Sequence, residues 1–121
     1  MTYEPCYWVI TSREELQAAY KNSWNLDAID FEHQFLISVH RGYCRGGGYR
    51  VRVKEIIQKD EEILVSLYFS DPDPLDFVIL VMTSPCDVVR VSKNKLVHRG
   101  RLLFRFIDEK GRELGKRVAV I

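Results

Sequence analysis

The 121 residues carry a net charge of +1, with 46% hydrophobic and 29% charged residues. A chain of this length can bury one packed core, and its charge indicates no polyanionic partner. No apolar run approaches the ~20 residues that span a bilayer. The cysteines Cys6, Cys44 and Cys86 form no CxxC pair, which favours a reducing compartment over a disulfide framework.

The N-terminal residues 1–5 lack the basic start and apolar stretch of a secretory signal. As written, the sequence therefore predicts a cytoplasmic protein. An exported protein is the alternative, if a leader has been removed.

Residues 11–24, TSREELQAAYKNSW, predict a helix. Ser12 can cap it, and Glu15, three residues on, can complete a capping box. Leu16 then begins an apolar face at helical spacing. The aromatic and β-branched segment at 6–10 predicts a short strand before this helix.

From Asp30 onward, apolar residues recur with the period of two that is typical of strands. In FEHQFLISVH, Ile37 and Val39 are expected on one face of a strand. Ser38 and His40 are expected on the opposite, polar face.

Further strands are predicted at YRVRVKEI, ILVSLYF, FVILVM, VVRV, RLLFRFI and KRVAVI, with polar turns between them. In YRVRVKEI, Val51 is expected to point inward and Arg50 and Arg52 outward. FVILVM, residues 77–82, is apolar on both faces and predicts a central strand. Seven or eight strands without βαβ alternation predict a mostly β fold: a small antiparallel β-sandwich or partly open barrel with one short N-terminal helix.

We expect a single domain over residues 1–121. In it, residues 1–29 supply the first strand and the helix, 30–93 form the β core, and 94–121 form a C-terminal hairpin.

The segment RGYCRGGGYRVRVK, residues 41–54, contains the consecutive glycines Gly46, Gly47 and Gly48. A phosphate-binding loop would need GK[ST] or a helix after its glycines, whereas here a strand follows. The segment therefore predicts a long connection between two strands. Glycine in such a loop permits positive φ and close approach of another group, so a binding loop and a plain corner or bulge are both open.

Positive charge is concentrated in residues 41–54 and 90–105, which contain no acid, whereas 55–76 carry seven acids. If the basic segments lie side by side, they would form a cationic face. A weak nucleic-acid-binding β domain is therefore the alternative function, using Arg50, Arg52, Lys54, Arg99 and Arg101. We favour interleaving with acidic neighbours, because the net charge is near zero and no RNP-like motif is present.

The sequence offers little for catalysis. Neither Cys44 nor Cys86 stands in a local signature of a cysteine hydrolase, and His33, His40 and His98 are scattered singly. No paired spacing suggests a zinc site, and the aspartates of SDPDPLD lack the EF-hand order. We therefore expect no enzyme activity, no metal and no cofactor.

The succession of DFEHQFLISVHRG, RGGGYRVRVKEI and TSPCDVVRVSK resembles the PrcB C-terminal domain family. The chain departs from the family pattern at Gly46, where a threonine is common, and at Cys86, where an aromatic residue often follows the proline. The matching positions are Asp30, Phe31, Gly42, Gly47, Gly48, Tyr49, Thr83, Pro85, Val88 and Val89.

The founding member of that family is an accessory protein of a bacterial surface protease complex. The resemblance therefore implies a non-enzymatic protein-binding or accessory module that supports the assembly or stability of a protease complex, with another protein as partner. A fainter likeness is to chagasin-type cysteine protease inhibitors, in which a glycine-containing loop lies beside a proline-containing loop. We expect one partner-binding surface made of Arg45, Gly46, Gly47, Gly48, Tyr49, Thr83, Ser84, Pro85 and Cys86.

Overall fold

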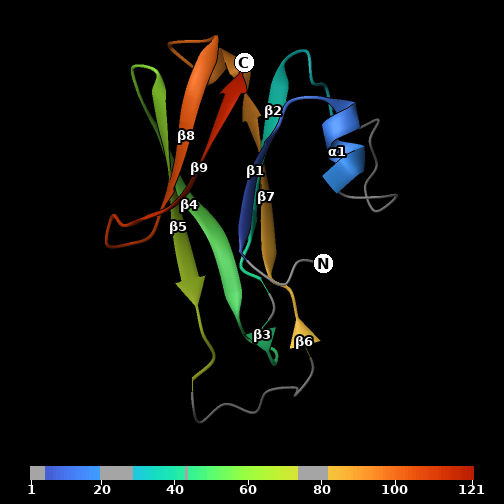
Figure 1. The fold of residues 1–121 in the computed structure, drawn as a ribbon, viewed down its shortest axis with the longest axis vertical. Helices are drawn as coiled ribbons and strands as arrows, with labels where there is room; N and C mark the ends of the chain where they lie inside the picture. Colours follow the sequence, from blue (N-terminus) through green and yellow to red (C-terminus); the bar gives the residue numbers. More distant parts are fainter. Residues whose placement is uncertain (1–4, 20–28, 43, 74–81) are drawn as a thin grey trace.

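The computed structural model describes residues 5–19, 29–42, 44–73 and 82–121 (Figure 1). Within these ranges the chain forms strands, one α-helix and a short 3₁₀ helix at Lys93–Lys95. The elements are β1 (Cys6–Ile10), α1 (Arg13–Ala19), β2 (Gln34–His40), β3 (Cys44–Arg45), β4 (Arg50–Lys59), β5 (Glu62–Ser70), β6 (Met82–Thr83), β7 (Cys86–Ser92), β8 (Arg101–Ile107) and β9 (Glu113–Val120).

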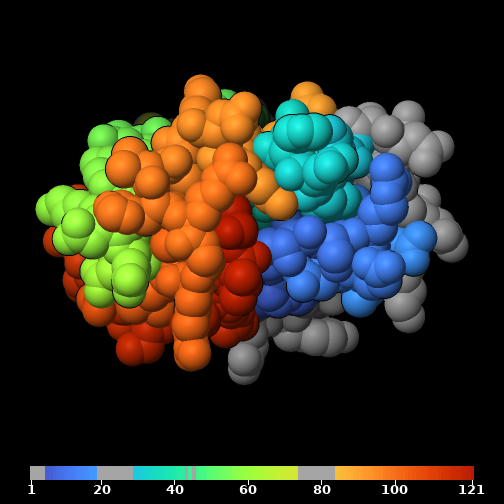
Figure 2. Space-filling view, turned by 90° about the horizontal axis from the view of Figure 1, so that it is seen from above, coloured from blue at the N-terminus to red at the C-terminus, as the bar shows by residue number. Residues whose placement is uncertain are grey.

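The described strands form two main sheets, in the orders β1-β2-β7 and β4-β5-β8-β9, and a small β3-β6 ladder. The main sheets pack face to face in a sandwich-like arrangement, which confirms the predicted mostly β fold with one short helix. Figure 2 shows the N-terminal strand, the helix and β2 on one side of the molecule and the β8–β9 hairpin on the other.

Aromatic rings fill much of the core between the sheets. Phe35 meets the edge of Phe104 with ring centroids 5.8 Å apart, and Tyr7 stacks on Phe106 at 5.1 Å. The buried aliphatic residues around them are Ile37, Val39, Val51, Ile63, Val65, Leu67 and Leu102. Burial of these side chains supplies the main driving force for folding.

The predicted C-terminal hairpin is present as β8 and β9, but the prediction of a purely antiparallel fold needs a correction. Strand β8 joins β5 in parallel, with Glu62 opposite Leu103 and Ser66 opposite Ile107. Parallel neighbours require a long crossover connection. Here the chain leaves β5, passes through β6 and β7 of the other sheets, and returns to lie beside β5.

The predicted polar face of β2 is also wrong, because Ser38 and His40 are buried. On this outer face of the sheet, Ile10 and Leu36 pack with Leu16 of α1 in a second hydrophobic cluster. β2 therefore lies between two apolar layers. The alternation of polar and apolar residues in β2 does not correspond to one buried face and one solvent-exposed face.

The predicted capping of the helix is confirmed in a modified form. The Ser12 hydroxyl accepts a hydrogen bond from the Glu15 N–H at 3.2 Å, while the Glu15 carboxylate accepts from the Thr11 N–H at 3.0 Å rather than from Ser12. The remainder of the predicted helix, residues 20–24, lies outside the described residues, as do residues 77–81 of the predicted central strand.

Candidate partner-binding surface

The glycine-rich loop (residues 45–49) and the Pro85 turn (residues 83–86), at least 34 residues apart in the sequence, lie side by side at one end of the fold (Figure 1). Strands β3 and β6 pair in antiparallel register, with Cys44 opposite Thr83 and Arg45 opposite Met82. The Arg41 N–H also donates to the Pro85 carbonyl at 2.9 Å. These backbone contacts bring together the two segments that we predicted to form one surface.

The glycines in the loop suit the local backbone geometry. Gly46 has φ +144° and Gly48 has φ +88°, a region of φ that favours glycine. A Cβ atom on Gly48 would lie 2.9 Å from the Cβ atom of Pro72. That face of Gly48 is therefore occupied by the protein itself, so the close approach that glycine permits here is intramolecular.

Arg41 fastens the loop to the adjoining strands. Its guanidinium donates to the carbonyls of Ser70 at 2.9 Å and Arg50 at 3.2 Å and pairs with the carboxylate of Asp71. The same group lies over the ring of Tyr49, 5.1 Å from the centroid. These contacts fix the start of β4 against the end of β5, and cation–π attraction holds Tyr49 in place.

A hollow of about 280 Å³ separates the two predicted segments. Tyr49, Arg50 and Arg52 line one side, and Pro85 and Cys86 line the other. Because exposed Arg50 and Arg52 flank it, this hollow presents positive charge next to an apolar and thiol-bearing wall.

Asp87 also lines this hollow, and it connects the two main sheets. Its carboxylate accepts a hydrogen bond from the Val53 N–H at 2.9 Å. Val53 is where the register of the β4–β5 ladder shifts, so the side chain of Asp87 satisfies a donor at an irregular point of the sheet edge.

The sequence analysis missed both Arg41 and Asp87. Their partners are Ser70, Asp71 and Val53, which lie 29, 30 and 34 residues away in the sequence. No local pattern links residues at such separations. The one signal was an aspartate directly before the valine pair of β7, where a partly buried charge needs a partner.

Ser84 belongs to the predicted surface, but its hydroxyl oxygen is buried. Within the described part of the chain, its oxygen has no hydrogen-bond partner. A buried hydroxyl without a partner costs about 1–3 kcal/mol, so a ligand group that reached it would gain more than an ordinary surface contact.

The environment of Cys86 does not resemble that of an activated nucleophile. Although Cys86 is exposed, partial desolvation of its thiol and the neighbouring Asp87 carboxylate raise the pKa of this thiol. His40 lies opposite Cys86 on β2, and burial lowers the pKa of this imidazole. A thiol with a raised pKa holds less thiolate at neutral pH than an ordinary cysteine.

One group of potential metal ligands occurs among the described residues, and it lies away from this surface. Asp30, Glu32 and His33 place their ligand atoms within 4.8 Å of one another, all exposed. His33 and Asp30 form a 2.6 Å contact, and the Glu32 N–H donates to Asp30 at 3.0 Å. These bonds form an Asx turn before β2, and the turn explains why the three side chains lie close together without a bound ion.

The two basic segments meet only in part. Strand β5 separates β4 from β8, and Glu62 of β5 pairs with Arg105 of β8 at 3.2 Å. Acidic residues thus interleave with the basic strands in this sheet, as we favoured. The end of β7 lies next to β4, where Arg90 and Lys54 line one groove.

The fold and this end surface define a small sandwich-like β domain with a loop surface built on paired backbone segments. The family model described as PrcB C-terminal matches residues 36–92, from β2 to β7. This match confirms the resemblance to the PrcB C-terminal family over residues 36–92. Both segments of the candidate surface lie inside the match. No curated protein and no solved structure matches the chain.

Among the described residues, no helix has the length and apolar character to cross a bilayer.

Proposed function

We propose that this chain is a non-enzymatic accessory module that binds another protein and supports the assembly or stability of a protease complex. The binding surface is the loop of residues 45–49 with the turn of residues 83–86. The observation that carries this proposal is the β3–β6 pairing, which holds both segments at one end of the domain. The match of residues 36–92 to the PrcB C-terminal family model supports the accessory role.

A binding surface on paired backbone keeps its shape before the partner arrives, which lowers the entropic cost of association. Arg41 holds the loop to the adjoining strands and contacts the ring of Tyr49. Arg50, Arg52 and the exposed Cys86 remain at the surface to contact a partner.

The test is an affinity capture from native lysate, read by mass spectrometry, with wild type and Cys86→Arg compared. An arginine at this exposed position would obstruct the hollow without disturbing the core. We expect a protease or protease subunit to be captured by wild type, to be retained after nuclease treatment, and to be reduced at least tenfold with Cys86→Arg.

Lys110→Glu is the matched control, because it changes a charge in the exposed β8–β9 turn. Equal capture by wild type and Cys86→Arg would contradict the assignment of the surface. Capture that disappears with nuclease would instead indicate the nucleic-acid alternative.

A further inference from the structure

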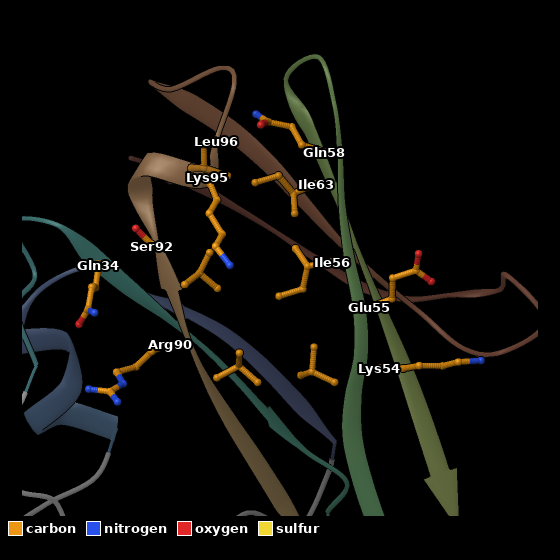
Figure 3. A pocket seen from close by; sticks show the side chains of 13 residues that line it. Gln34, Lys54, Glu55, Ile56, Gln58, Ile63, Arg90, Ser92, Lys95 and Leu96 are labelled. Carbon is orange, nitrogen blue, oxygen red and sulfur yellow. The ribbon is translucent and has the colours of Figure 1, made fainter.

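A groove of about 630 Å³ opens between the two main sheets (Figure 3), on the other side of the Asp87–Val53 hydrogen bond from the hollow at the loop surface. Strand β7 is the last strand of one sheet and β4 is the last strand of the other. The Asp87–Val53 hydrogen bond of 2.9 Å joins these two edges at one end. Beyond this bond the strands diverge, and the groove lies between them.

Polar and apolar residues both line the groove, and its inner part is apolar. Ile56 and Ile63 project from the β4–β5 side, and Val91 and Leu96 project from the β7 side. Ile63 is fully buried, whereas the others are half-buried and pack against the main core. A ligand here would therefore cover apolar surface that is continuous with the core.

Lys95 places a positive charge over these walls. Figure 3 shows its ammonium directed into the space between β7 and β4. Arg90 points to the far side of β7, and Lys54 and Glu55 point to the far side of β4. Lys95 thus supplies the charge that a ligand in the groove would meet.

The segment that carries Lys95 is well anchored. The 3₁₀ helix Lys93–Lys95 begins with the Ser92 hydroxyl accepting from the Asn94 N–H at 3.4 Å. Lys93 donates from its ammonium to the Phe31 carbonyl at 2.8 Å. Across the mouth of the groove, Gln58 accepts from the Val97 N–H at 2.8 Å. The ammonium is therefore presented from a fixed element.

The edge of β7 that borders the groove suits the addition of a strand. The N–H of Arg41 donates to Pro85 and the N–H of Lys93 donates to His33, each at 2.9 Å. Both bonds join odd-numbered residues, and the register of the β2–β7 ladder extends this pattern along the whole of β7. The odd-numbered residues of β7 therefore bond to β2, and the even-numbered ones direct their backbone groups to the other side. The backbone N–H and C=O of Val88 and Ser92 consequently face away from β2, toward the groove.

We propose that this groove binds an extended, apolar peptide segment of a partner protein that carries a carboxylate beside Lys95. The segment adds to the edge of β7, places alternate apolar side chains on the walls, and pairs its acidic side chain with the ammonium. This is β-strand addition, in which backbone bonds supply affinity and pockets for alternate side chains supply specificity. The groove does not depend on the loop surface.

The probe is a short fluorescein-labelled peptide of alternating valine and glutamate, titrated by fluorescence anisotropy. A peptide of alternating valine and lysine is its matched control. We expect wild type to bind the glutamate peptide and Lys95→Glu to bind it at least tenfold more weakly. Lys95→Glu should bind the lysine peptide better than wild type does, a gain that an unfolded variant could not show.

Lys110→Glu and the loop variant Cys86→Arg should both keep the affinity of wild type for the glutamate peptide. In an amide NMR spectrum, Val88 and Ser92 should shift when the peptide binds. Equal binding of the glutamate peptide by wild type and Lys95→Glu would overturn the proposal. Binding of dodecanoate without binding of the peptide would also overturn it, in favour of a site for small amphiphiles.

Discussion

Gly48 meets two separate requirements at a single backbone position. Its φ of +88° favours glycine, and Pro72 leaves no room for a Cβ atom, the distance being 2.9 Å. Gly100 shares only the first requirement, because its φ is +96° but nothing lies within 4 Å of the position its Cβ would occupy. Substitutions at the two positions can therefore be compared to distinguish the cost of backbone strain from the cost of steric overlap.

We predict that Gly48→Ala lowers the free energy of unfolding by about 2–4 kcal/mol and Gly100→Ala by about 1–2 kcal/mol. Both variants force alanine into the left-handed region, and only Gly48→Ala also displaces Pro72. Urea unfolding of both variants at one pH measures the difference. Equal losses would show that the ring of Pro72 moves aside without cost and that backbone strain alone accounts for the glycine at position 48.

At the scale of single residues, the sequence indicated where the site lies but could not show how it is held. The glycine-rich loop was predictable, because consecutive glycines before an alternating strand are typical of a connection that needs positive φ. Arg41 and Asp87 were not, because a charged residue next to a strand acquires its role only when distant segments meet it.

At the scale of whole elements, predictions succeeded where one face of a strand remained wet. In β4, Val51 is buried while Arg50 and Arg52 are exposed, as the alternation predicted. In β2 the alternation predicted a polar face that the structure buries beneath Trp8 and the Leu16 cluster. Periodicity records which residues are polar, whereas a covering layer from elsewhere in the chain decides which of them stay in water.

The burial of β2 encloses the imidazole of His40. Its ring lies 5.5 Å from that of Trp8, and its Nε2 lies 3.3 Å from the hydroxyl oxygen of Ser38. Burial lowers the pKa of His40 in the folded state below its ordinary value of 6.5. Between these two values the unfolded chain binds more protons than the folded one. The contribution of His40 to stability is therefore lost as the pH falls from about 6.5 through the folded pKa.

We predict that wild type loses more stability than His40→Gln when the pH is lowered through this window. The slope from one such group cannot exceed about 1.4 kcal/mol per pH unit. Urea unfolding across the window measures it. His33 has a raised pKa because of its hydrogen bond to Asp30, so its contribution has the opposite sign, but it is present in both proteins and cancels. Parallel curves for wild type and His40→Gln would contradict the prediction.

At the scale of the whole molecule, the two sheets make close contact along both pairs of edges but by different means. Between β7 and β4 the contact is polar, through Asp87 and Val53 at 2.9 Å. Between β1 and β9 it is apolar: a Cβ atom on Gly115 would lie 2.9 Å from Cδ2 of Tyr7. The ring of Tyr7 also stacks on Phe106 at 5.1 Å, so it lies flat between the two sheets.

The absence of a side chain at Gly115 therefore lets Tyr7 dock one sheet on the other. We predict that Gly115→Ala lowers the free energy of unfolding by about 1–3 kcal/mol, because the new methyl group overlaps the ring. In a Tyr7→Leu background the same substitution should be neutral or stabilising by about 0.5–1 kcal/mol, since alanine loses less backbone entropy than glycine in a strand. A double-mutant cycle by urea unfolding gives the coupling between the two positions. A coupling near zero would mean that β1 shifts to accommodate the methyl group, and that the sheets are docked by the Phe35–Phe104 contact rather than by Tyr7.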